Sequence, residues 1–588
     1  MGRPYLNNTR IIKILLIFSF FLLFFALIVL ETSSQLSHYE LSIYSSIPLF
    51  WILIASSTSI TIATAIYQLC TKNYHNFWLS FFCILLNDFI IFSVPYFRGY
   101  YLYGSNDVFA HLEYTRFIIL HGNIGSNYYP ITHILGAEET EIWSIPPEIT
   151  FKFLPVIFTM LFIVFICFLA IVVSSRKEHV AISAVAGAIP IFSYYHVAVY
   201  PHTLSLFLFP LGFYLYFKVQ KTKELGYIVA LIILLVLIPY THAITSIVFI
   251  CCLGAAEVGK IIWKRRVSKL SERITFNFFL ISLITFFMWW SSFAIFGMGL
   301  QRINNWLFAE GSKIPRANEI MSVFQLGQEK WIELLIKNYG PQLIYIVLSL
   351  VALAMVIYAL KQKKIEMRDL FIVSILFLTS TLVYSLLFLT TGAMTIGRFF
   401  GSNVGAWVTP ILAAYTLFVM QKTKRKDIIA MFIAITLIFS FFLGILSVYR
   451  SPWTLQPNWQ ATYKDASGIE WYDEHGDKIT TIVMACPIGS VASIPPNFGY
   501  SDHEMLGESL SEDSILLFGE YRQRLASENP NLLNSPIMDI WAYPNFKEND
   551  FNRLRLDESV NLLYTNEEFN VLFIKSIVGS GNENRTHS

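Results

Sequence analysis

Long apolar runs, separated by short polar connections, fill most of the 588-residue chain. About 20 apolar residues in a helix span the hydrocarbon layer of a bilayer, so runs of this size are candidate membrane spans. The runs lie at 11–30, 46–66, 77–95, 151–173, 181–199, 203–217, 227–256, 274–297, 342–360, 370–390, 403–420 and 428–448. This pattern predicts an α-helical polytopic membrane protein whose first run is an uncleaved anchor.

Basic residues determine how these runs are counted, because Lys and Arg concentrate in the cytoplasmic connections of membrane proteins. The basic connections are Arg176–Lys177, Lys218–Lys223, Lys260–Arg273, Lys361–Arg368 and Lys422–Lys426. Both flanks of the 227–256 run are cytoplasmic only if this run crosses twice, with Pro239–His242 at its outer turn. The chain is therefore predicted to cross the cell (plasma) membrane about 13 times, with a cytoplasmic N-terminus and an extracytoplasmic C-terminal region.

Composition agrees with a membrane protein. Hydrophobic residues make up 55% of the chain and charged residues only 14%, whereas soluble domains carry about 25% charged residues. The net charge of +2 gives no basic surface for nucleic acid. The six cysteines are predicted to be small apolar fillers.

The predicted topology divides the chain into four parts. Residues 1–76 hold two N-terminal spans, and residues 77–297 form a seven-span core with a large outer loop at 96–150. Residues 298–448 hold a second outer loop followed by four spans. The apolar density falls in 449–588, where runs such as Ser514–Phe518 predict buried strands of a small extracytoplasmic α/β domain with a disordered tail.

The first outer loop contains a polar stretch at Ser105–His133. Ser105 is a good N-cap, and Asp107 then falls in the first helical turn, where the helix dipole favours a carboxylate. His111 and Tyr114 follow at i+4 and i+7, so all three project from one face of an amphipathic helix suited to a membrane surface. An ordinary capped surface helix is an equally open interpretation of the same pattern.

A second acidic group follows in the same loop at Glu138, Glu139 and Glu141. Together with Asp107 and Glu113, it gives the loop an acidic surface. Such carboxylates bind a divalent cation such as Mn²⁺ or Mg²⁺, or act as a general base on an acceptor. A solvated face is the more common role of a glutamate run.

Basic candidates on the outer side include Arg398, which stands in a short connection with Gly392, Gly397 and Gly401 around it. A bidentate arginine there suits a lipid phosphate, although snorkelling to the headgroups is the alternative. The other outer basic residues are Arg98, Arg116, Arg302, Lys313 and Arg316.

Histidines gather at the predicted outer face. His202 and His242 lie at two outer turns, and His111, His121 and His133 lie in the first loop. No pair has the tight spacing of a zinc motif, so a structural zinc site is not expected.

Asp88 is the clearest charge inside a predicted span, with no second intramembrane charge expected to pair with it. An intramembrane carboxylate is a functional candidate by default, and a protonated packing residue is the alternative. Nucleotide-binding motifs are also lacking, so an enzyme on the outer face would take an activated substrate delivered through the lipid.

Two motifs of the first loop resemble the GT-C superfamily of membrane glycosyltransferases. Asn106-Asp107-(x)3-His111-Leu112-(x)3-Arg116 resembles their first-loop acidic motif, and Tyr128-Tyr129-Pro130-Ile131-Thr132-His133 resembles the Tyr-Pro-x-x-His segment of bacterial and archaeal members. The order of spans over 77–297 is similar to their seven-span core. The chain departs from the family in having Asn106-Asp107 in place of a paired acidic motif, and its tail has no Trp-Trp-Asp signature.

The resemblance implies a polyprenyl-phosphate-linked sugar donor and a site on the outer face. The resemblance implies Asp107 as the catalytic carboxylate, acting as a base or a metal ligand. His111 and Glu113 are further catalytic candidates, and Glu139 is the candidate second ligand of a divalent cation. The residues expected to bind the substrate or the lipid phosphate are Arg116, Tyr129, His133, His202, His242, Arg302 and Arg398.

The expected activity is transfer of a sugar from this donor to a lipid, glycan or protein acceptor. The expected partners are the lipid-linked donor and membrane lipids, without nucleic acid. A monosaccharide transferase fits better than an oligosaccharyltransferase. Two alternatives stay open: a transporter of polyprenyl lipid or polysaccharide, which would depend on Asp88, and a non-catalytic membrane scaffold whose tail binds partners.

Overall fold

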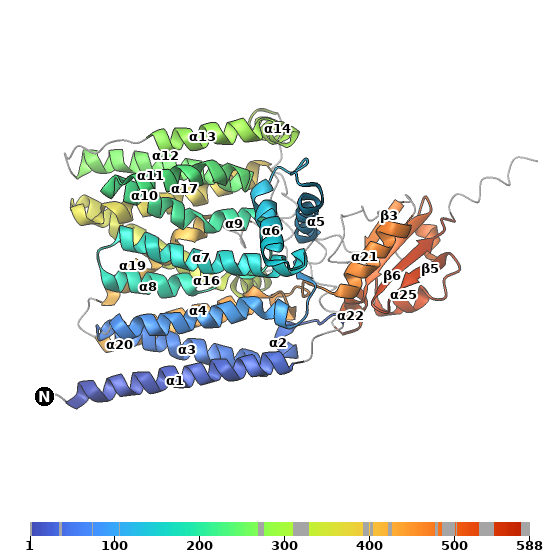
Figure 1. Ribbon diagram of the computed structural model, residues 1–588, viewed down its shortest axis with the longest axis horizontal. Helices are drawn as coiled ribbons and strands as arrows, with labels where there is room; N and C mark the ends of the chain where they lie inside the picture. Colours follow the sequence, from blue (N-terminus) through green and yellow to red (C-terminus); the bar gives the residue numbers. More distant parts are fainter. Residues whose placement is uncertain are drawn as a thin grey trace, which may run out of the picture.

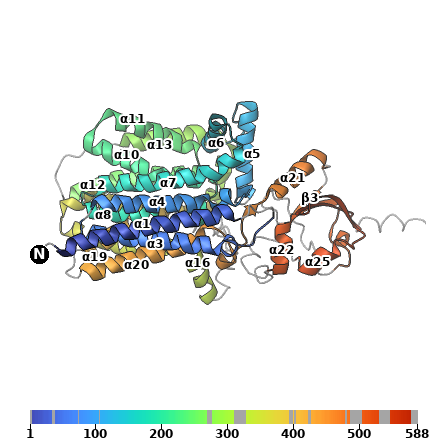
Figure 2. The ribbon, with the colours of Figure 1, turned by 60° about the horizontal axis from the view of Figure 1, so that its bottom comes forward.

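A bundle of long helices carries a small β-sheet at one end (Figure 1). The computed structural model describes residues 3–33, 38–72, 74–104, 106–267, 276–309, 328–391, 399, 404–421, 426–476, 480–484, 500, 503–528 and 546–577. Two further helices, α5 (Asn106–His121) and α6 (Pro130–Trp143), lie across the bundle at the end nearest the sheet in both views (Figures 1 and 2). We call this the loop end of the bundle.

The predicted apolar runs coincide with helices of the bundle. These are α1 (Arg3–Thr32), α3 (Pro48–Cys70), α4 (Tyr74–Phe97), α7 (Pro147–Val173), α8 (Lys177–Ala188), α9 (Pro201–Phe207), α10 (Phe209–Thr222), α11 (Leu225–Leu237), α12 (Ala243–Arg266), α13 (Phe276–Trp290), α16 (Gln328–Lys361), α17 (Arg368–Thr391), α19 (Thr409–Gln421) and α20 (Lys426–Val448). The short helix α2 (Ile43–Ser46) precedes α3, and α14 (Ala294–Phe308) follows α13.

Eight helices of the described residues are long and apolar enough to cross a membrane, and the pair α13–α14, bent by 109°, brings the number to nine. The remaining runs form shorter helices, so the total of 13 stays a prediction. The 181–199 run is helical only to Ala188, because the residue before Pro190 is extended and the chain then forms a short 3-10 turn at Ser193–His196. The length and apolar composition of these helices indicate a multi-pass membrane protein.

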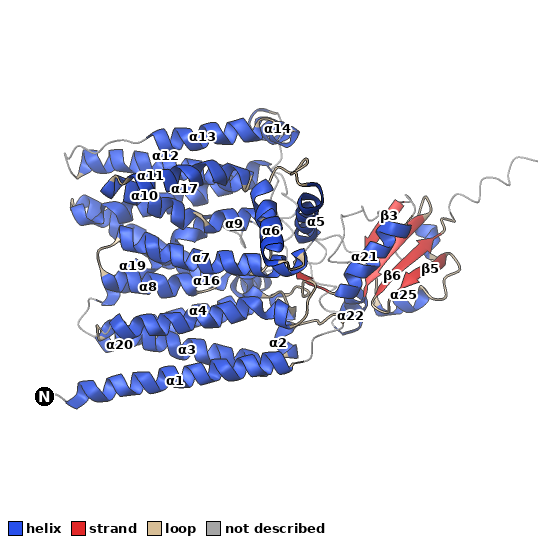
Figure 3. Cartoon of the chain, viewed as in Figure 1, coloured by secondary structure: helices blue, strands red, loops and turns tan. Residues whose placement is uncertain are grey.

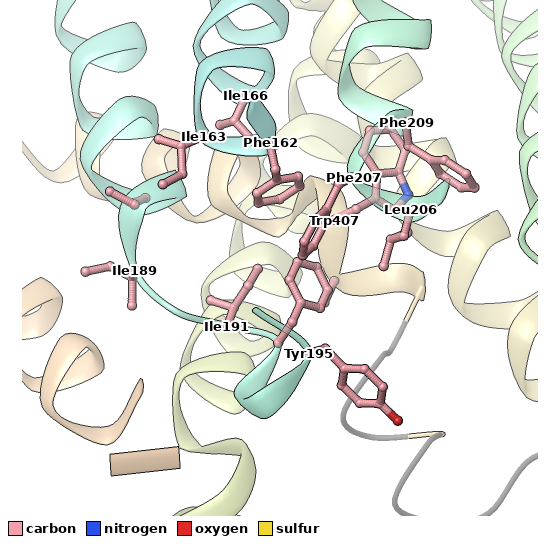
Figure 4. Close-up of a cluster of buried hydrophobic side chains, with 14 of the residues drawn as sticks. Phe162, Ile163, Ile166, Ile189, Ile191, Tyr195, Leu206, Phe207, Phe209 and Trp407 are labelled. Carbon is pink, nitrogen blue, oxygen red and sulfur yellow. The ribbon is translucent and has the colours of Figure 1, made fainter. Parts of the chain in front are cut away.

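Glycines let the helices of the bundle approach closely. A Cβ atom on Gly212 would lie 2.7 Å from the Phe249 ring, and one on Gly187 would lie 2.9 Å from Ile166. Small residues at such crossings are the usual means of packing helices in lipid, where apolar burial alone gives little attraction. Figure 4 shows part of this interior, with Tyr195 at its edge and the Tyr195 hydroxyl pointing away from the apolar side chains.

A buried polar network joins the N-terminal segment to the chain that leaves the bundle. Arg98 and Glu40 form an ion pair of 3.1 Å with only 3% and 4% of their side chains exposed. The Tyr100 hydroxyl donates to Glu40, and the Asn458 amide donates to the Tyr100 oxygen at 3.0 Å. Beside this network, β1 (Leu102–Tyr103) pairs antiparallel with β2 (Gln460–Ala461). The segment between α4 and α5 and the C-terminal region are thus fixed to each other.

The C-terminal sheet has the order β3-β4-β6-β5 (Figure 3). Its strands are β3 (Thr480–Met484), β4 (Ser514–Gly519), β5 (Val560–Thr565) and β6 (Phe569–Ile574), and its helices are α21 (Tyr463–His475), α22 (Glu520–Glu528) and α25 (Glu548–Arg553). The pairing of β3 with β4 is parallel and the other two are antiparallel. The strand β4 coincides with the predicted apolar run Ser514–Phe518, whereas the side chains of β5 are mostly exposed and form no such run.

Candidate active site

The first catalytic candidates lie on α5. Gly104, just before the helix, has φ +145° and sits where a Cβ atom would lie 2.3 Å from Val108, so the chain enters the helix through a conformation that requires glycine. Val108 and Leu112 are 1% exposed and anchor α5 to the interior. Asp107 lies in the first turn and His111 is partly exposed one turn later, both on one face. The predicted helix is confirmed.

A chain of hydrogen bonds connects His111 to the following loop. The Tyr129 backbone N–H donates to Asn127 Oδ1 at 2.8 Å, and Asn127 Nδ2 lies 2.5 Å from His133 Nδ1. His133 Nε2 lies 3.0 Å from His111 Nδ1. His133 belongs to α6 and is fully buried, whereas His111 is partly exposed. The loop between α5 and α6 therefore holds the His111 ring through a relay that begins at a backbone group.

Two more histidines reach the same place from different helices. His202 lies at the start of α9, and His242 is the N-cap residue of α12. Their ring centroids are 5.4 Å apart, and His242 stacks on Tyr129 at 5.1 Å. Both positions lower the pKa of His111, which places them near it. We call His111, His133, His202 and His242 the histidine cluster.

Burial keeps the histidine cluster neutral. It lowers the pKa of His133 to about 4 and that of His202 to about 3. The pKa values of His111 and His242 also fall well below their usual range, first because of burial and then because of the neighbouring histidines. At physiological pH these side chains are therefore uncharged hydrogen-bonding groups.

A metal does not fit the histidine cluster. Both nitrogens of His133 and one nitrogen of His111 already take part in hydrogen bonds. Within the described ranges, no group of three or more His, Cys, Asp or Glu residues is arranged to hold a metal ion. Glu139, the expected second ligand beside Asp107, is half-buried on α6, and burial raises its pKa. The reaction proposed below therefore has no step that involves a metal ion.

Two other candidates lie on a different face of α5. Arg116 forms an ion pair with Glu113 at 2.9 Å. It also donates a hydrogen bond to the Tyr101 hydroxyl at 2.8 Å. Its second carboxylate neighbour is Glu148 at 3.8 Å, at the start of α7. Glu113 and Arg116 line an open groove of about 530 Å³. Glu113 thus contacts Arg116, and no contact joins it to the histidine cluster.

The remaining basic candidates are less well placed. Arg302 is exposed on α14, where its guanidinium lies 3.5 Å from the Thr391 carbonyl oxygen at the end of α17. Arg398 lies outside the described residues. The structure therefore brings together five of the candidates, namely His111, Tyr129, His133, His202 and His242. Neither Arg302 nor Arg398 is placed in this group.

The sequence analysis missed Arg450, which follows α20 at the loop end. Its side chain is 5% exposed, and its guanidinium carbon lies 3.3 Å from the Trp459 ring centroid and 4.1 Å from that of Tyr194. Ring contacts continue from Tyr194 through Tyr195 to His202 at 4.2 and 5.2 Å. Arg398 stands out in the sequence as a basic residue of a predicted outer connection, and Arg450, just after the 428–448 run on the same predicted side, carries that signal too.

Comparisons with known proteins gave only structural matches, since no family model and no curated protein sequence matches the chain. The oligosaccharyltransferase of Archaeoglobus fulgidus, crystallised with Zn and sulfate, has 12% sequence identity and a TM-score of 0.48, covering 84% of this chain and 73% of its own. ArnT from Cupriavidus metallidurans has 10% identity and a TM-score of 0.46, covering 85% of this chain and 98% of its own.

A further match is AglB from the same archaeon in complex with an inhibitory peptide and a dolichol-phosphate, at 12% identity and a TM-score of 0.45, covering 87% of this chain and 75% of its own. AglB and ArnT are GT-C membrane glycosyltransferases, the superfamily that the loop motifs resemble. Because these TM-scores and identities are low, no residue role and no activity is carried over from them.

Proposed function

We propose that this protein is a membrane glycosyltransferase that moves a sugar from a polyprenyl-phosphate donor to a lipid, glycan or protein acceptor at the loop end of the bundle. In this proposal the loop end is the outer face of the membrane, and the residues from 449 onward form its extracytoplasmic domain. The basic connections would then face the cytoplasm.

One observation carries the proposal. Asp107, in the first turn of α5, lies on the face that also presents His111, and the His111 ring contacts His133 of α6. His202 of α9 and His242 at the start of α12 contact each other, and His242 stacks on Tyr129 of the same loop end. Helices far apart in the sequence converge on this polar site at the loop end of a mostly apolar bundle. Convergent polar groups of unusual pKa at the end of a bundle are typical of a binding or catalytic site.

The chemistry asked of the site is substitution at the anomeric carbon of the sugar. The bond from this carbon to the phosphate oxygen breaks, and a new bond to the acceptor oxygen or nitrogen forms with inversion. Asp107 takes the proton of the acceptor as general base, and the polyprenyl phosphate leaves with the bonding electrons. Since the phosphate is already a good leaving group, positioning and charge stabilisation supply the rest.

Several cationic groups would hold the phosphate. Arg302 and Arg398 are the candidates from the second outer loop and the connection after α17. Arg450 supplies a further buried positive charge next to the ring contacts that lead to His202. Arg116, with its contacts to Tyr101 and Glu148, would instead align α5 with the start of α7.

The test is transfer by the purified protein in lipid, supplied with radiolabelled polyprenyl-phosphate sugars, with and without EDTA. The Asp107→Asn variant should lose at least about a hundredfold in transfer, the usual contribution of a general base. Glu141→Gln is the matched control, because Glu141 is an exposed carboxylate of the same loop. It should keep wild-type activity.

Full transfer by a folded Asp107→Asn variant would show that Asp107 is not the base. Lipid flux across the vesicle without any bond formation would instead indicate a transporter. If neither transfer nor flux occurs and the tail alone retains partner binding, the scaffold interpretation holds. Loss of transfer in EDTA would show that a cation binds outside the described geometry.

A further inference from the structure

The hydrogen bonds around Asn127 fix which atoms carry protons. A backbone N–H only donates, so the contact from Tyr129 N at 2.8 Å requires that the Asn127 oxygen faces Tyr129. The Asn127 NH₂ group must then face His133 Nδ1, at 2.5 Å. Since the amide group donates there, His133 Nδ1 is an acceptor and carries no proton.

The same reasoning passes along the relay. A histidine with a bare Nδ1 carries its proton on Nε2, so His133 Nε2–H donates to His111 Nδ1 at 3.0 Å. His111 Nδ1 is thus an acceptor as well, and the His111 proton must lie on Nε2. A positive charge on either ring would place two donors face to face at one of these contacts.

The relay ends on an unused donor. His111 Nε2–H makes no hydrogen bond with any described residue, and His111 is partly exposed. Next to it, His202 Nε2 is shielded from solvent and also has no hydrogen-bond partner among the described residues. The shielded His202 Nε2 therefore has unsatisfied hydrogen-bonding capacity, which is costly unless a ligand satisfies it, and the partly exposed His111 donor is open to a ligand.

We propose that His111 is locked as a neutral hydrogen-bond donor for an anionic oxygen, the phosphate of the polyprenyl-phosphate donor, and that Asn127 and His133 are the positioning residues that set its tautomer. His111 is then a substrate-binding residue of the leaving group and not a base. The inference rests on the proposed function for the identity of the lipid. The tautomer itself depends only on the hydrogen bonds.

Binding measures the donor without turnover. The wild-type protein in phosphatidylcholine nanodiscs is incubated with tritiated polyprenyl phosphate, and unlabelled polyprenol or inorganic phosphate serves as competitor. His111→Gln keeps an N–H group near the Nε2 position, whereas His111→Asn keeps only the shorter reach of Nδ1. We expect His111→Asn to weaken lipid-phosphate binding by about tenfold to a hundredfold, as for a hydrogen bond to a charged group, and His111→Gln to weaken it much less.

The competitors separate the sources of the phosphate. If inorganic phosphate displaces the labelled lipid at low concentration, the His111 N–H group binds free phosphate, and the assignment to a lipid phosphate is overturned. Unchanged binding in His111→Asn, or equal losses in Asn and Gln variants that remain folded, would overturn the donor role. Because this assay involves no transfer, a protein that binds through His111 without transferring sugar would refute the proposed function and leave this inference standing.

The tautomer can be read in the unmodified protein. Solid-state NMR of protein with isotope-labelled histidine rings distinguishes a protonated from a bare ring nitrogen, and His111→Gln identifies the His111 signals. We expect a protonated Nε2 and a bare Nδ1 for His111 at neutral pH, and a changed His111 signal in Asn127→Ala. A protonated Nδ1, or a cationic ring, in the wild-type protein would overturn the inference. This outcome does not depend on the folding of a variant.

Discussion

The Glu257–Lys260 cluster and the histidine cluster differ in how completely their hydrogen bonds are satisfied. In the first, Lys260 Nζ lies 2.7 Å from Glu257 Oε2 within α12, and the Tyr216 hydroxyl of α10 donates to Glu257 Oε1 at 2.7 Å. The Lys260 and Glu257 side chains are 2% and 1% exposed. Both oxygens of the carboxylate have a partner, so this cluster is complete without a ligand.

The histidine cluster at the loop end is incomplete. His111 Nε2 has no hydrogen-bond partner among the described residues, and the His111 side chain is partly exposed. His202 Nε2 also has no such partner, and this atom is shielded from solvent behind the exposed part of the cluster. Leaving a buried polar group unsatisfied costs about 1–3 kcal/mol, so such groups persist where a ligand completes them. Satisfied polar groups thus indicate structure, and reachable unsatisfied groups indicate a binding site.

The largest effect should come from breaking the complete cluster. Lys260→Met leaves Glu257 buried without its cation, and removal of one partner of a buried ion pair costs about 3–5 kcal/mol. We expect a much lower unfolding temperature, with unchanged transfer per folded molecule. Arg265→Met, at an exposed position of the same helix, is the control.

The paired replacement Glu257→Gln with Lys260→Met should recover most of the stability, because no charge then remains buried. Loss of transfer in this stable double variant would assign the Glu257–Lys260 cluster a functional role. A complete set of hydrogen bonds would then not distinguish a structural cluster from a binding site.

Acid should reveal the histidine cluster next. The unfolded chain binds protons on histidine below about pH 6.5, whereas folded His133 and His202 stay neutral down to about pH 4 and about pH 3. Protons therefore bind preferentially to the unfolded state, and stability falls as the pH drops below 6.5. From pH 7 to pH 5 each buried histidine should remove about 2 kcal/mol from the free energy of unfolding.

Unfolding midpoints across this pH range test the prediction. His202→Phe should remove its share of the acid sensitivity, whereas His121→Gln should not change it, because His121 is exposed. A flat stability profile in the wild-type protein would show that the histidines are not held neutral.

A smaller effect is expected from His202→Phe at neutral pH. Phenylalanine keeps the ring contacts to Tyr195 and His242 at 5.2 and 5.4 Å but removes the unsatisfied Nε2 atom. We expect transfer to fall about tenfold, the loss of roughly one hydrogen bond to the substrate, while the protein becomes no less stable. Tyr200→Phe is a matched control, since it removes a polar atom from a ring that contacts His202 at 5.6 Å. An equal loss of stability and transfer would make His202 a structural residue.

The sequence predicted most of the long helices but neither β5 nor the contacts between the elements. Apolar runs located the helices, and the spacing of Asp107 and His111 placed them on one face, since both signals are local. The meeting of His133, His202 and His242 depends on how α6, α9 and α12 cross, which no local pattern encodes. The relay through Asn127 was missed for the same reason, because an asparagine in a loop has no distinctive signature.

The Glu257–Lys260 pair was missed for a different reason. In the sequence, the apolar run ends at residue 256, and Lys260 is the first residue of the predicted basic connection Lys260–Arg273. The structure continues α12 to Arg266 and buries both side chains, with the Glu257 carboxylate hydrogen-bonded to Tyr216 of α10. A charged pair at i, i+3 neutralises itself, so it interrupts an apolar run without ending the helix.

The smallest effect should come from Asp88. This residue of α4 is fully buried, and neither carboxylate oxygen has a hydrogen-bond partner among the described residues. Unlike His111, it presents no exposed atom through which a ligand could reach it, so the contrast above predicts a packing role. Asp88→Asn keeps the size of the side chain and should change transfer by less than about twofold, as substitutions outside a site do. If transfer instead falls as far as in Asp107→Asn while the protein stays folded, unsatisfied groups inside the spans are functional too, and lipid transport becomes the activity to assay.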